Sequence, residues 1–264
     1  MIEQTLKNNI QISKYDWFNI YTFKNDLMGK DIANGKCWEP HIVKFLNNNL
    51  TKESTFIDVG SNYGWHSIIA SKLCKEVHSF EPQKVMCEIQ KMSILENNLE
   101  NCHIYDIALG ETTKEAKMAS INYLQEGINI GDLSLGSDGE SIIVKTIDSF
   151  NFNRIDVIKI DVQGYETFVL DGALESIKQH KPIMIIEFEN FQMSKFSYSP
   201  KELFNKIKEL DYEIYFLEYT YPSDHVCIHK SMVNNFEKNN TVVTLSVSND
   251  LNNNLDNGIT KKII

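Results

Sequence analysis

Acidic residues occur where three successive apolar segments end. Asp58 lies in FIDVGSNYGWHS, Glu81 closes EVHSFE, and Asp106 follows CHIY. If these segments are parallel strands, the three acids lie at the carboxyl edge of a sheet, where ligands bind in such folds. A row of carboxylates suits a ligand with positive charge and repels a phosphate group. The pattern therefore predicts a site for a cationic cofactor.

The turn after the first of these segments separates two classes of cofactor. A dinucleotide-binding fold carries G-x-G-x-x-G here, so that bare backbone can approach a pyrophosphate. This chain has Ser61-Asn62-Tyr63 between Gly60 and Gly64, and the second glycine of that fingerprint is missing. We expect Asn62 and the bulky Tyr63 to crowd a diphosphate. They need not crowd S-adenosylmethionine, which has no phosphate and carries a positive sulfonium.

Two of the acids can be assigned to the nucleoside part of this cofactor. Glu81 lies 21 residues after Gly60, where a carboxylate can accept hydrogen bonds from both ribose hydroxyls. Asp106, after the third strand, is placed to reach the adenine side. Together with the turn, these positions predict S-adenosylmethionine as the cofactor.

A lysine lies in the middle of a further apolar strand, in DVIKIDVQGYE. Because side chains alternate along a strand, Lys159 and Asp161 share one face. A lysine there is costly unless it is paired, and Asp161 is the obvious partner. Gly164 would allow a tight exit from the strand, and Glu166 lies in the first turn of the next helix, where the dipole favours a carboxylate. Two interpretations remain open: a catalytic pair, or a buried ion pair that only fixes strand and helix.

Methyl transfer to a hydroxyl is an in-line displacement that needs alignment and removal of a proton. In the catalytic interpretation, Asp161 lies beside the transferred methyl group, and Lys159 orients Asp161. Candidates for the base are Asp161 and Glu187 (in IIEFE), with His66 and His41 as imidazole alternatives. Two neighbouring carboxylates could instead hold a divalent metal that acidifies the hydroxyl. No metal ligand is assigned from the sequence.

The elements that must position these residues alternate between strands and helices. The predicted strands are residues 55–59, 76–80, 102–109, 141–147, 156–162, 182–189, 212–219 and 225–230. The predicted helices are a short one from His41, 64–75, 83–99, one from about Tyr165, and 199–210, with Ser199 as its cap and Pro200 in its first turn. Such alternation predicts an α/β fold with a mostly parallel sheet covered by helices on both faces. The last two strands are joined by a short turn, TYPSD, so the last strand is expected to be antiparallel.

Several motifs carry a family resemblance. FIDVGSNYGWHS, SFEPQ, IALG, VKTIDSF, DVIKIDVQGYETFVLDGA and PIMIIEFE resemble, in order and rough spacing, the FkbM-type S-adenosylmethionine-dependent methyltransferases. GKCWEP resembles an N-terminal element of that family, so the resemblance runs from about Trp38 to about Glu189. It implies a class I methyltransferase (Rossmann-like) fold with a seven-stranded sheet, and O-methylation of sugars or other hydroxylated metabolites. It also implies a role in glycan biosynthesis or carbohydrate modification.

The resemblance and the motifs together assign the site residues. The predicted catalytic residues are Asp161, Lys159 and Glu187. The predicted cofactor-binding residues are Glu39, Asp58, Gly60, Ser61, Asn62, Tyr63, Gly64, Glu81, Pro82, Asp106, Ile107, Ala108 and Asp161. One position departs from the family, which commonly reads K-I-D-x-E-G-x-E, whereas this chain has Gln163 at the middle acid. Substrate choice and activity depend on what this glutamine does.

Length and charge limit the remaining possibilities. The chain has 264 residues and a formal net charge of −10, so a surface that follows nucleic-acid phosphates is not expected. We predict an N-terminal extension (1–35), a methyltransferase domain (36–233) and an Asn-rich C-terminal tail (234–264), in which TVVTLSV could add an edge strand. The N-terminus has no apolar signal segment, no run is long enough for a membrane, and the five cysteines contain no CxxC pair. A cytoplasmic monomer or homodimer that acts on a small molecule or glycan is expected.

Other features have weaker interpretations. His225 and His229 share a strand face and could form a metal pair, although an edge-strand or core role is preferred because no third ligand is apparent. The segment 117–140 is polar and contains glycines, so it is interpreted as a substrate-side loop or hairpin. Trp38-Glu39-Pro40 either closes over the cofactor or caps the following helix. An aromatic group could line a sugar pocket or belong to the strand core: Tyr212, Tyr215, Phe216, Tyr219 and Tyr221.

Two rival functions remain open at this point. The first is an NAD-dependent oxidoreductase, which the missing pyrophosphate glycine argues against. The second is a non-catalytic binding module that retains the fold, for which Gln163 is the suspicious residue. Identifying the bound cofactor would distinguish the oxidoreductase from a methyltransferase. Measuring turnover would distinguish the binding module from an enzyme.

Overall fold

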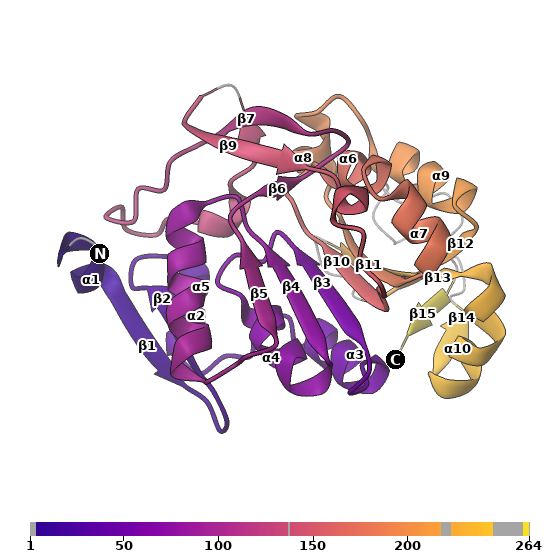
Figure 1. Ribbon diagram of the computed structural model, residues 1–264, viewed down its shortest axis with the longest axis horizontal. Coiled ribbons are helices and arrows are strands. Elements are labelled where there is room, and N and C mark those ends of the chain that lie inside the picture. The colour runs from indigo at the N-terminus through magenta and orange to yellow at the C-terminus, as the bar shows by residue number, and fades with distance from the viewer. Residues whose placement is uncertain (1–3, 137, 218–222, 245–260, 264) are drawn as a thin grey trace. The chain divides into compact units, whose positions relative to one another are not determined.

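The computed structural model describes residues 4–136, 138–217, 223–244 and 261–263. The chain divides into two compact units, whose helices and strands are labelled in Figure 1. Unit 1 consists of Met1–Ala108 and Thr113–Val144, and unit 2 consists of Leu109–Thr112 and Lys145–Ile264.

Unit 1 is built around three parallel strands. β3 (Thr55–Val59), β4 (Glu76–Phe80) and β5 (Cys102–Tyr105) pair in that order. α4 (Trp65–Leu73) connects β3 to β4, and α5 (Lys84–Glu96) connects β4 to β5, as the alternating pattern predicts. Every residue of β3 is buried, which is typical of a parallel strand covered on both faces. The third predicted strand is shorter than expected, and β6 (Ala108–Leu109) is separate from β5.

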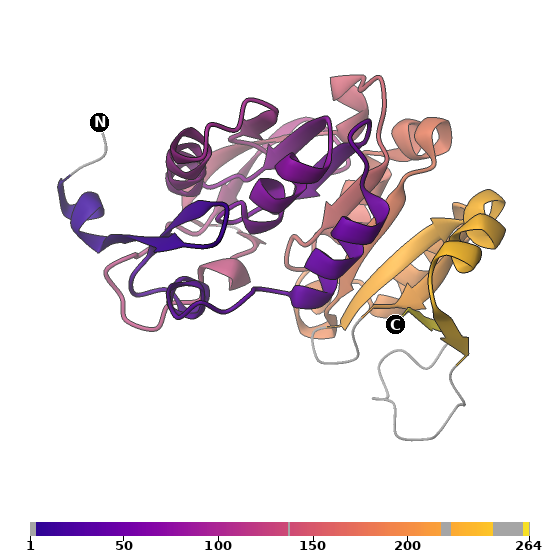
Figure 2. The ribbon, with the colours of Figure 1, turned by 90° about the horizontal axis from the view of Figure 1, so that it is seen from below.

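The N-terminal part of unit 1 is structured, although the sequence predicts no helix or strand before His41. It contains α1 (Gln4–Asn9), β1 (Ile10–Lys14), β2 (Asn19–Phe23) and α2 (Leu27–Ala33). The next helix, α3 (Pro40–Asn49), is the short helix predicted from His41. β1 and β2 form an antiparallel hairpin, and α2 packs on it, as the indigo segments of Figure 2 show. Asn97, at the end of α5, accepts from the backbone N–H of Asn19 at 2.7 Å. The hairpin is therefore fastened to the helix that follows β4.

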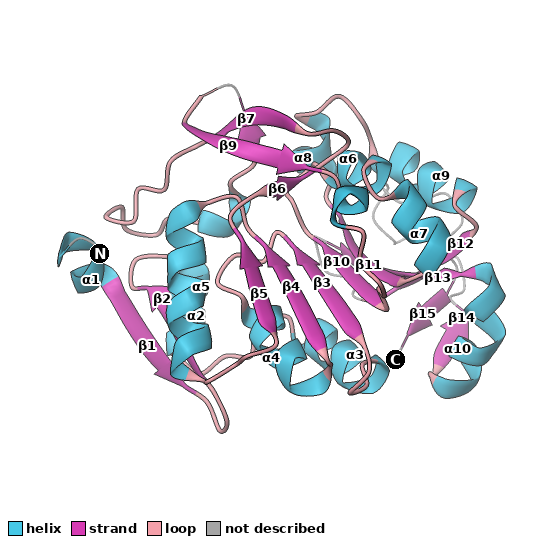
Figure 3. Ribbon diagram, in the orientation of Figure 1, coloured by secondary structure: helices cyan, strands magenta, loops and turns pink. Residues whose placement is uncertain are grey.

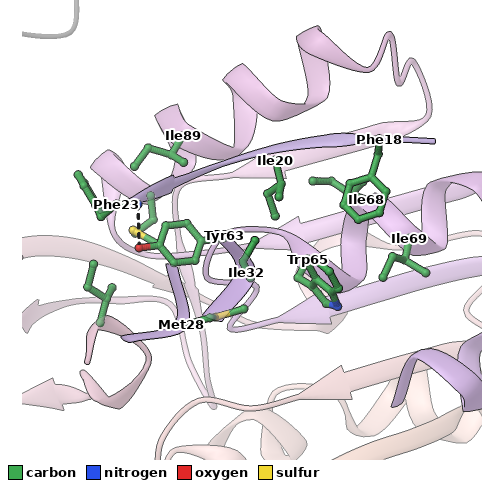
Figure 4. Packing of buried hydrophobic residues seen from close by; sticks show 12 residues of the cluster. Phe18, Ile20, Phe23, Met28, Ile32, Tyr63, Trp65, Ile68, Ile69 and Ile89 are labelled. Atoms are coloured by element: carbon green, nitrogen blue, oxygen red, sulfur yellow. Dashed lines mark hydrogen bonds between the residues drawn. The ribbon is translucent and has the colours of Figure 1, made fainter. Parts of the chain in front are cut away.

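The hairpin and α2 contribute to the hydrophobic core of unit 1. Phe18, Ile20 and Phe23 lie in one buried cluster with residues of α2, of the turn after β3 and of α4 and α5 (Figure 4). Other apolar residues before His41, such as Ile12, Trp17 and Leu27, are exposed. The sequence pattern does not predict this packing, because the hairpin and the helix use different periods over very short lengths.

The segment after β6 forms a small antiparallel sheet in unit 1. β7 (Lys114–Met118) pairs with β8 (Leu135–Gly136) and with β9 (Glu140–Lys145), and η1 (Ile130–Asp132) precedes β8. Figure 3 shows β7 and β9 as neighbouring magenta strands. The hairpin interpretation of residues 117–140 is therefore confirmed. The predicted strand 141–147 lies mostly in this small sheet.

A buried carboxylate joins this insert to the N-terminal part. Asp26 is fully buried and caps α2. Its Oδ2 accepts from the N–H of Gly29 at 2.7 Å, and its Oδ1 accepts from the N–H of Ile130 at 3.0 Å. One side chain thus satisfies two backbone groups that lie 101 residues apart in the sequence.

Replacing Asp26 by Ala is expected to lower the free energy of unfolding by about 3 kcal/mol, because two buried N–H groups lose a charged acceptor. Urea denaturation would measure the change. Asp16→Ala, at an exposed position of the same hairpin, is the matched control. An equal effect of both substitutions would contradict the role assigned to Asp26.

Unit 2 carries six strands in the order β14-β15-β12-β13-β11-β10. They are β10 (Val157–Ile160), β11 (Ile183–Phe188), β12 (Tyr212–Phe216), β13 (Ser223–His229), β14 (Val242–Thr244) and β15 (Lys261–Ile263). β10 and β11 are parallel, and β13 is antiparallel to both β11 and β12. The prediction that the last strand is antiparallel is confirmed, while most of the predicted turn lies outside the described residues. β14 and β15 add to the seven strands expected, and β14 falls in the TVVTLSV segment.

The helices of unit 2 include the two predicted segments, one from about Tyr165 and one over residues 199–210, together with others that the sequence does not predict. They are η2 (Ile147–Phe150), α6 (Glu166–Asp171), α7 (Leu174–His180), α8 (Asn190–Ser194), α9 (Pro200–Glu209), η3 (Lys230–Met232) and α10 (Val233–Asn239). The single helix expected from Tyr165 is interrupted at Gly172-Ala173. Ser199 forms a capping box with Glu202, and Pro200 opens the helix, as predicted. Across the described ranges, we find no helix with the length and apolar character of a membrane span.

Candidate active site

The register of unit 1 brings three predicted positions side by side. Gly60, Glu81 and Asp106 directly follow β3, β4 and β5, whose last residues are paired with one another. The N–H of Gly60 donates to the carbonyl of Phe80 at 3.0 Å, and that of Glu81 donates to the carbonyl of Tyr105 at 3.1 Å. Asp106 is exposed, and Glu81 is buried. Two of the three acids predicted at the strand ends, Glu81 and Asp106, thus lie at one edge, whereas Asp58 is buried within β3.

The turn after β3 is left-handed at three positions. Gly60, Asn62 and Gly64 have φ angles of 80°, 51° and 76°. Glycine adopts these angles without strain, and asparagine tolerates them better than most residues. A Cβ on Gly64 would also come within 3.1 Å of Oε1 of Gln90. The left-handed backbone of this turn therefore favours glycine at both ends of the G-x-x-x-G spacing.

The carboxylate of Glu81 holds this turn. Its Oε2 accepts from the N–H of Asn62 at 3.0 Å, and its Oε1 accepts from the N–H of Gln83 at 2.9 Å. Each carboxylate oxygen has two lone pairs, so both oxygens retain the capacity to accept a hydroxyl. A structural role and the predicted ribose contact are compatible.

Gln90 on α5 is a site residue that the sequence analysis did not identify. Its side chain is buried, and its Nε2 donates to Oγ of Ser61 at 2.8 Å and to the carbonyl of Asn62 at 2.6 Å. Its Oε1 accepts from Oγ of Ser79 at 2.7 Å. One amide therefore ties the turn to β4 and α5. The sequence feature that could have identified Gln90 is its position on the buried face of an amphipathic helix, four residues after Met86.

The side chain of Tyr63 does not lie where the sequence analysis expects it. It is fully buried in the core of unit 1, and its hydroxyl accepts from the N–H of Phe23 at 3.2 Å (Figure 4). Burial, together with the nearby Asp26 carboxylate, raises the pKa of the Tyr63 phenol well above its ordinary value. The expectation that Tyr63 crowds a diphosphate is wrong, because only its backbone faces the turn. Of the two residues expected to crowd a diphosphate, only Asn62 remains.

Other predicted cofactor residues of unit 1 have structural partners. Asp58 is buried and accepts from Oγ of Ser67 at 2.7 Å. Glu39 precedes α3 in a left-handed conformation, and its Oε2 lies 3.4 Å from Nε2 of the buried His66. The capping interpretation of Trp38-Glu39-Pro40 fits this position, since Pro40 opens α3. The three other predicted cofactor residues differ in exposure: Pro82 and Ile107 are half-buried and Ala108 is buried.

The predicted catalytic residues of unit 2 form one cluster. Nζ of the buried Lys159 lies 2.8 Å from Oδ2 of Asp161, so the predicted ion pair is present. The residues just before Asp161 and Glu187 are partners in the register of β10 and β11, which places these carboxylates on neighbouring strands. Nε2 of Gln163 donates to Oδ1 of Asp161 at 3.0 Å and to Oε2 of Glu187 at 3.2 Å. Lys159, Asp161, Gln163 and Glu187 therefore act as one hydrogen-bonded group.

Glu166 fixes the loop that carries Gln163. Its Oε1 accepts from the N–H groups of Val162 and Gly164 at 3.2 and 3.1 Å. The hydroxyl of Tyr198 donates to the carbonyl of Gly164 at 2.6 Å and lies 3.0 Å from Oε2 of Glu166. A hydroxyl has one proton, so a neutral Glu166 can donate back to Tyr198. Burial raises the pKa of Glu166 from its ordinary 4.5 to about 7, which fits this arrangement.

Glu166→Gln is expected to remove one component of the pH dependence of stability. The folded carboxyl binds its proton more tightly than the unfolded one, so stability is lost as pH rises from 4.5 through about 7. Gln keeps an acceptor for the two N–H groups and does not ionise. The difference in unfolding free energy between wild type and variant should shift in favour of the variant by up to about 3 kcal/mol between pH 4 and 8. Parallel curves across this range would exclude Glu166 as the titrating group.

The alternative metal site in unit 2 is not supported. His225 packs between Phe188 and Phe216, with ring centroids 4.4 and 4.7 Å away. His229 lies four residues further along β13, which is about 13 Å in a strand. One metal ion cannot be ligated by both, so the metal-pair interpretation is wrong.

The aromatic group predicted on the last strands belongs mainly to the core. Tyr212, Tyr215 and Phe216 are buried in β12. Tyr219 and Tyr221 lie outside the described residues. For the described members, the strand-core interpretation is confirmed.

Solved structures with a similar arrangement include several methyltransferases. Methyltransferase FkbM from Methylobacillus flagellatus KT is 16% identical, with a TM-score of 0.48 over 67% of this chain and 44% of that chain. This chain thus spans less than half of that protein. A putative methyltransferase from Streptococcus mutans in complex with SAH is 16% identical, with a TM-score of 0.47 over 73% of this chain and 97% of that chain. An rRNA methylase from Streptococcus thermophilus is 13% identical, with a TM-score of 0.45 over 72% and 93% of the two chains.

The family assignment comes from the sequence model of the Methyltransferase FkbM domain, which matches residues 58–214, more than half of the chain. This range contains the turn after β3, the acids after β4 and β5, and the cluster around Gln163. A search of curated proteins finds no match. The α/β fold class and the cofactor predicted from the motifs are those of this family. The chain belongs to the FkbM family of S-adenosylmethionine-dependent methyltransferases.

Proposed function

We propose that this protein transfers a methyl group to a hydroxyl of a sugar, nucleotide-sugar, glycan or similar polyhydroxylated metabolite. The observation that carries the proposal is the cluster of Lys159, Asp161, Gln163 and Glu187, which combines two carboxylates with an ammonium and an amide within 3.2 Å. Such a group can accept hydrogen bonds from hydroxyls and remove a proton from one of them. The net charge of −10 argues against the alternative of an RNA acceptor.

The residues at the strand ends of unit 1 fit the cofactor. Glu81 offers carboxylate lone pairs suited to ribose hydroxyls, and the exposed Asp106 offers an acceptor suited to an adenine amino group. Oδ1 of Asn62 is buried and has no hydrogen-bond partner among the described residues, as expected for an acceptor that a ligand would satisfy. When bound, S-adenosylmethionine supplies an electrophilic methyl group on a positive sulfonium.

The chain's own residues would then act on the acceptor. Asp161 or Glu187 removes the proton from the attacking hydroxyl oxygen. Lys159 keeps Asp161 in place, since its ammonium is buried and donates to one carboxylate oxygen. The in-line geometry of methyl transfer makes such positioning worth several orders of magnitude in rate.

The proposal is tested by incubating the protein with methyl-labelled S-adenosylmethionine and a panel of nucleotide-sugars, free glycans and RNA. We expect label on a sugar in a linkage that survives mild base, as an ether does and an ester does not. A variant with both Asp161→Asn and Glu187→Gln is the control. Label on RNA alone would overturn the substrate class. Failure to label any acceptor, with cofactor bound, would favour a non-catalytic binding module.

A further inference from the structure

The side-chain amide of Gln163 lies between two carboxylates. Its nitrogen is 3.0 Å from Oδ1 of Asp161 and 3.2 Å from Oε2 of Glu187. The two protons of the amide serve one carboxylate each. The reverse orientation would direct the amide oxygen at two acceptors, so the atom between the two carboxylates is assigned as the amide nitrogen.

The backbone around Gln163 is wound tightly to reach this position. Gln163 has a φ of 53° and Gly164 a φ of 98°. A Cβ on Gly164 would stand 2.3 Å from the carbonyl oxygen of Gln192. A left-handed conformation is costly for glutamine, and such strain persists where surrounding contacts impose it, often at functional sites. Here Glu166 and Tyr198 supply those contacts.

The charges around the amide explain why a donor is needed there. The ammonium of Lys159 pairs with the other oxygen of Asp161. Glu187 is opposite Asp224 in the register of β11 and β13, so a further acid stands on the neighbouring strand. Carboxylates close together resist simultaneous ionisation unless something positive or a donor lies between them. The ionisable groups in and around this cluster are Lys159 on β10, Asp161 directly after β10, Glu187 on β11, Asp224 opposite Glu187 on β13, and Glu166 and Tyr198, which hold the loop of Gln163.

We propose that Gln163 is a positioning residue: its amide takes the place of a cation between Asp161 and Glu187 and holds the two carboxylate groups at a fixed separation. The role of that separation in methyl transfer rests on the function proposed above, whereas the amide bridge itself does not. The two can therefore be tested apart.

The test is Gln163→Glu, which replaces the bridging donor by a third carboxyl group of the same shape. Below its raised pKa the new carboxyl is neutral and can still donate, so the variant should melt near the wild-type temperature at pH 5. As pH rises toward 8 the third charge forms, and the melting temperature should fall below that of wild type by about 5 °C. Manganese(II), used alone as the probe, should restore most of this loss, because oxygen ligands from several carboxylates bind divalent cations. Manganese should leave the melting temperature of wild type unchanged, and the pH dependence that Glu166 gives to wild type is shared by the variant and cancels in the comparison.

Gln125→Glu is the matched control, since it adds the same charge at an exposed position of unit 1. A Gln163→Glu protein that follows this control at every pH, with and without manganese, would overturn the proposal. If Gln163→Glu does not fold, Gln163→Met removes the donor without adding charge. It should lose stability relative to wild type as pH rises from 5 to 8, and a difference independent of pH would contradict the bridge. None of these measurements requires the acceptor, so a failed proposal for the acceptor leaves them intact.

With an acceptor in hand, the same variants report on catalysis. Gln163→Glu should shift the acidic limb of the pH–rate profile upward, because protonation of the crowded carboxylates then extends to higher pH. The dissociation constant for S-adenosylmethionine should remain within about twofold of wild type. Equal losses at every pH would assign Gln163 a merely structural role.

Discussion

Asp161→Asn is expected to reduce turnover about a hundredfold to ten-thousandfold, the usual loss for a general base. The affinity for S-adenosylmethionine should change much less. Asp161 accepts from Lys159 through one oxygen and from Gln163 through the other, and an asparagine can serve only one of these donors. The measurement is kcat with labelled cofactor at saturating acceptor, together with calorimetric titration of the cofactor.

Glu187→Gln is the comparison that separates the two candidate bases. Both side chains accept a hydrogen bond from the same amide, and Asp161 also accepts from Lys159. If Glu187→Gln is inactive while Asp161→Asn turns over nearly normally, Glu187 is the base. Normal turnover by both variants would move proton removal to a histidine or to solvent, and the proposed role of β10 would fail.

Glu81→Ala is expected to weaken binding of S-adenosylmethionine by about 1–3 kcal/mol, the loss of charged hydrogen bonds to ribose. The structure adds a second cause, because the carboxylate also holds the N–H groups of Asn62 and Gln83. Calorimetry with the cofactor and with NAD measures both affinity and selectivity.

Two further variants make this result specific. Glu81→Gln keeps one acceptor oxygen and should retain part of the affinity. Glu88→Ala removes an acid from the exposed face of α5, where it pairs with Lys91, and should leave affinity unchanged. Unaltered binding by Glu81→Ala, or tight binding of NAD by the wild type, would remove the ribose assignment.

Much of the site follows from local rules that operate within a few residues. Lys159 and Asp161 meet because side chains two residues apart share a strand face, and the ion pair is present. Gly60 and Gly64 mark a turn with left-handed angles, and the apolar segments around them become β3 and α4. Ser199 and Pro200 start α9 as capping chemistry predicts.

The tertiary structure decided which distant groups became partners. Gln163 bridges residues on two strands, which depends on strand register and on a strained loop that Glu166 holds. The turn after β3 is held by Gln90, 26 residues beyond Gly64. Tyr63 lies in the core because the N-terminal hairpin provides a partner for its hydroxyl. Periodicity and turn chemistry extend over a few residues, whereas hydrogen bonds between separate elements depend on how those elements pack. The sequence alone therefore determined the strand ends, the turn and the paired lysine of this methyltransferase, and packing decided how its carboxylates are held.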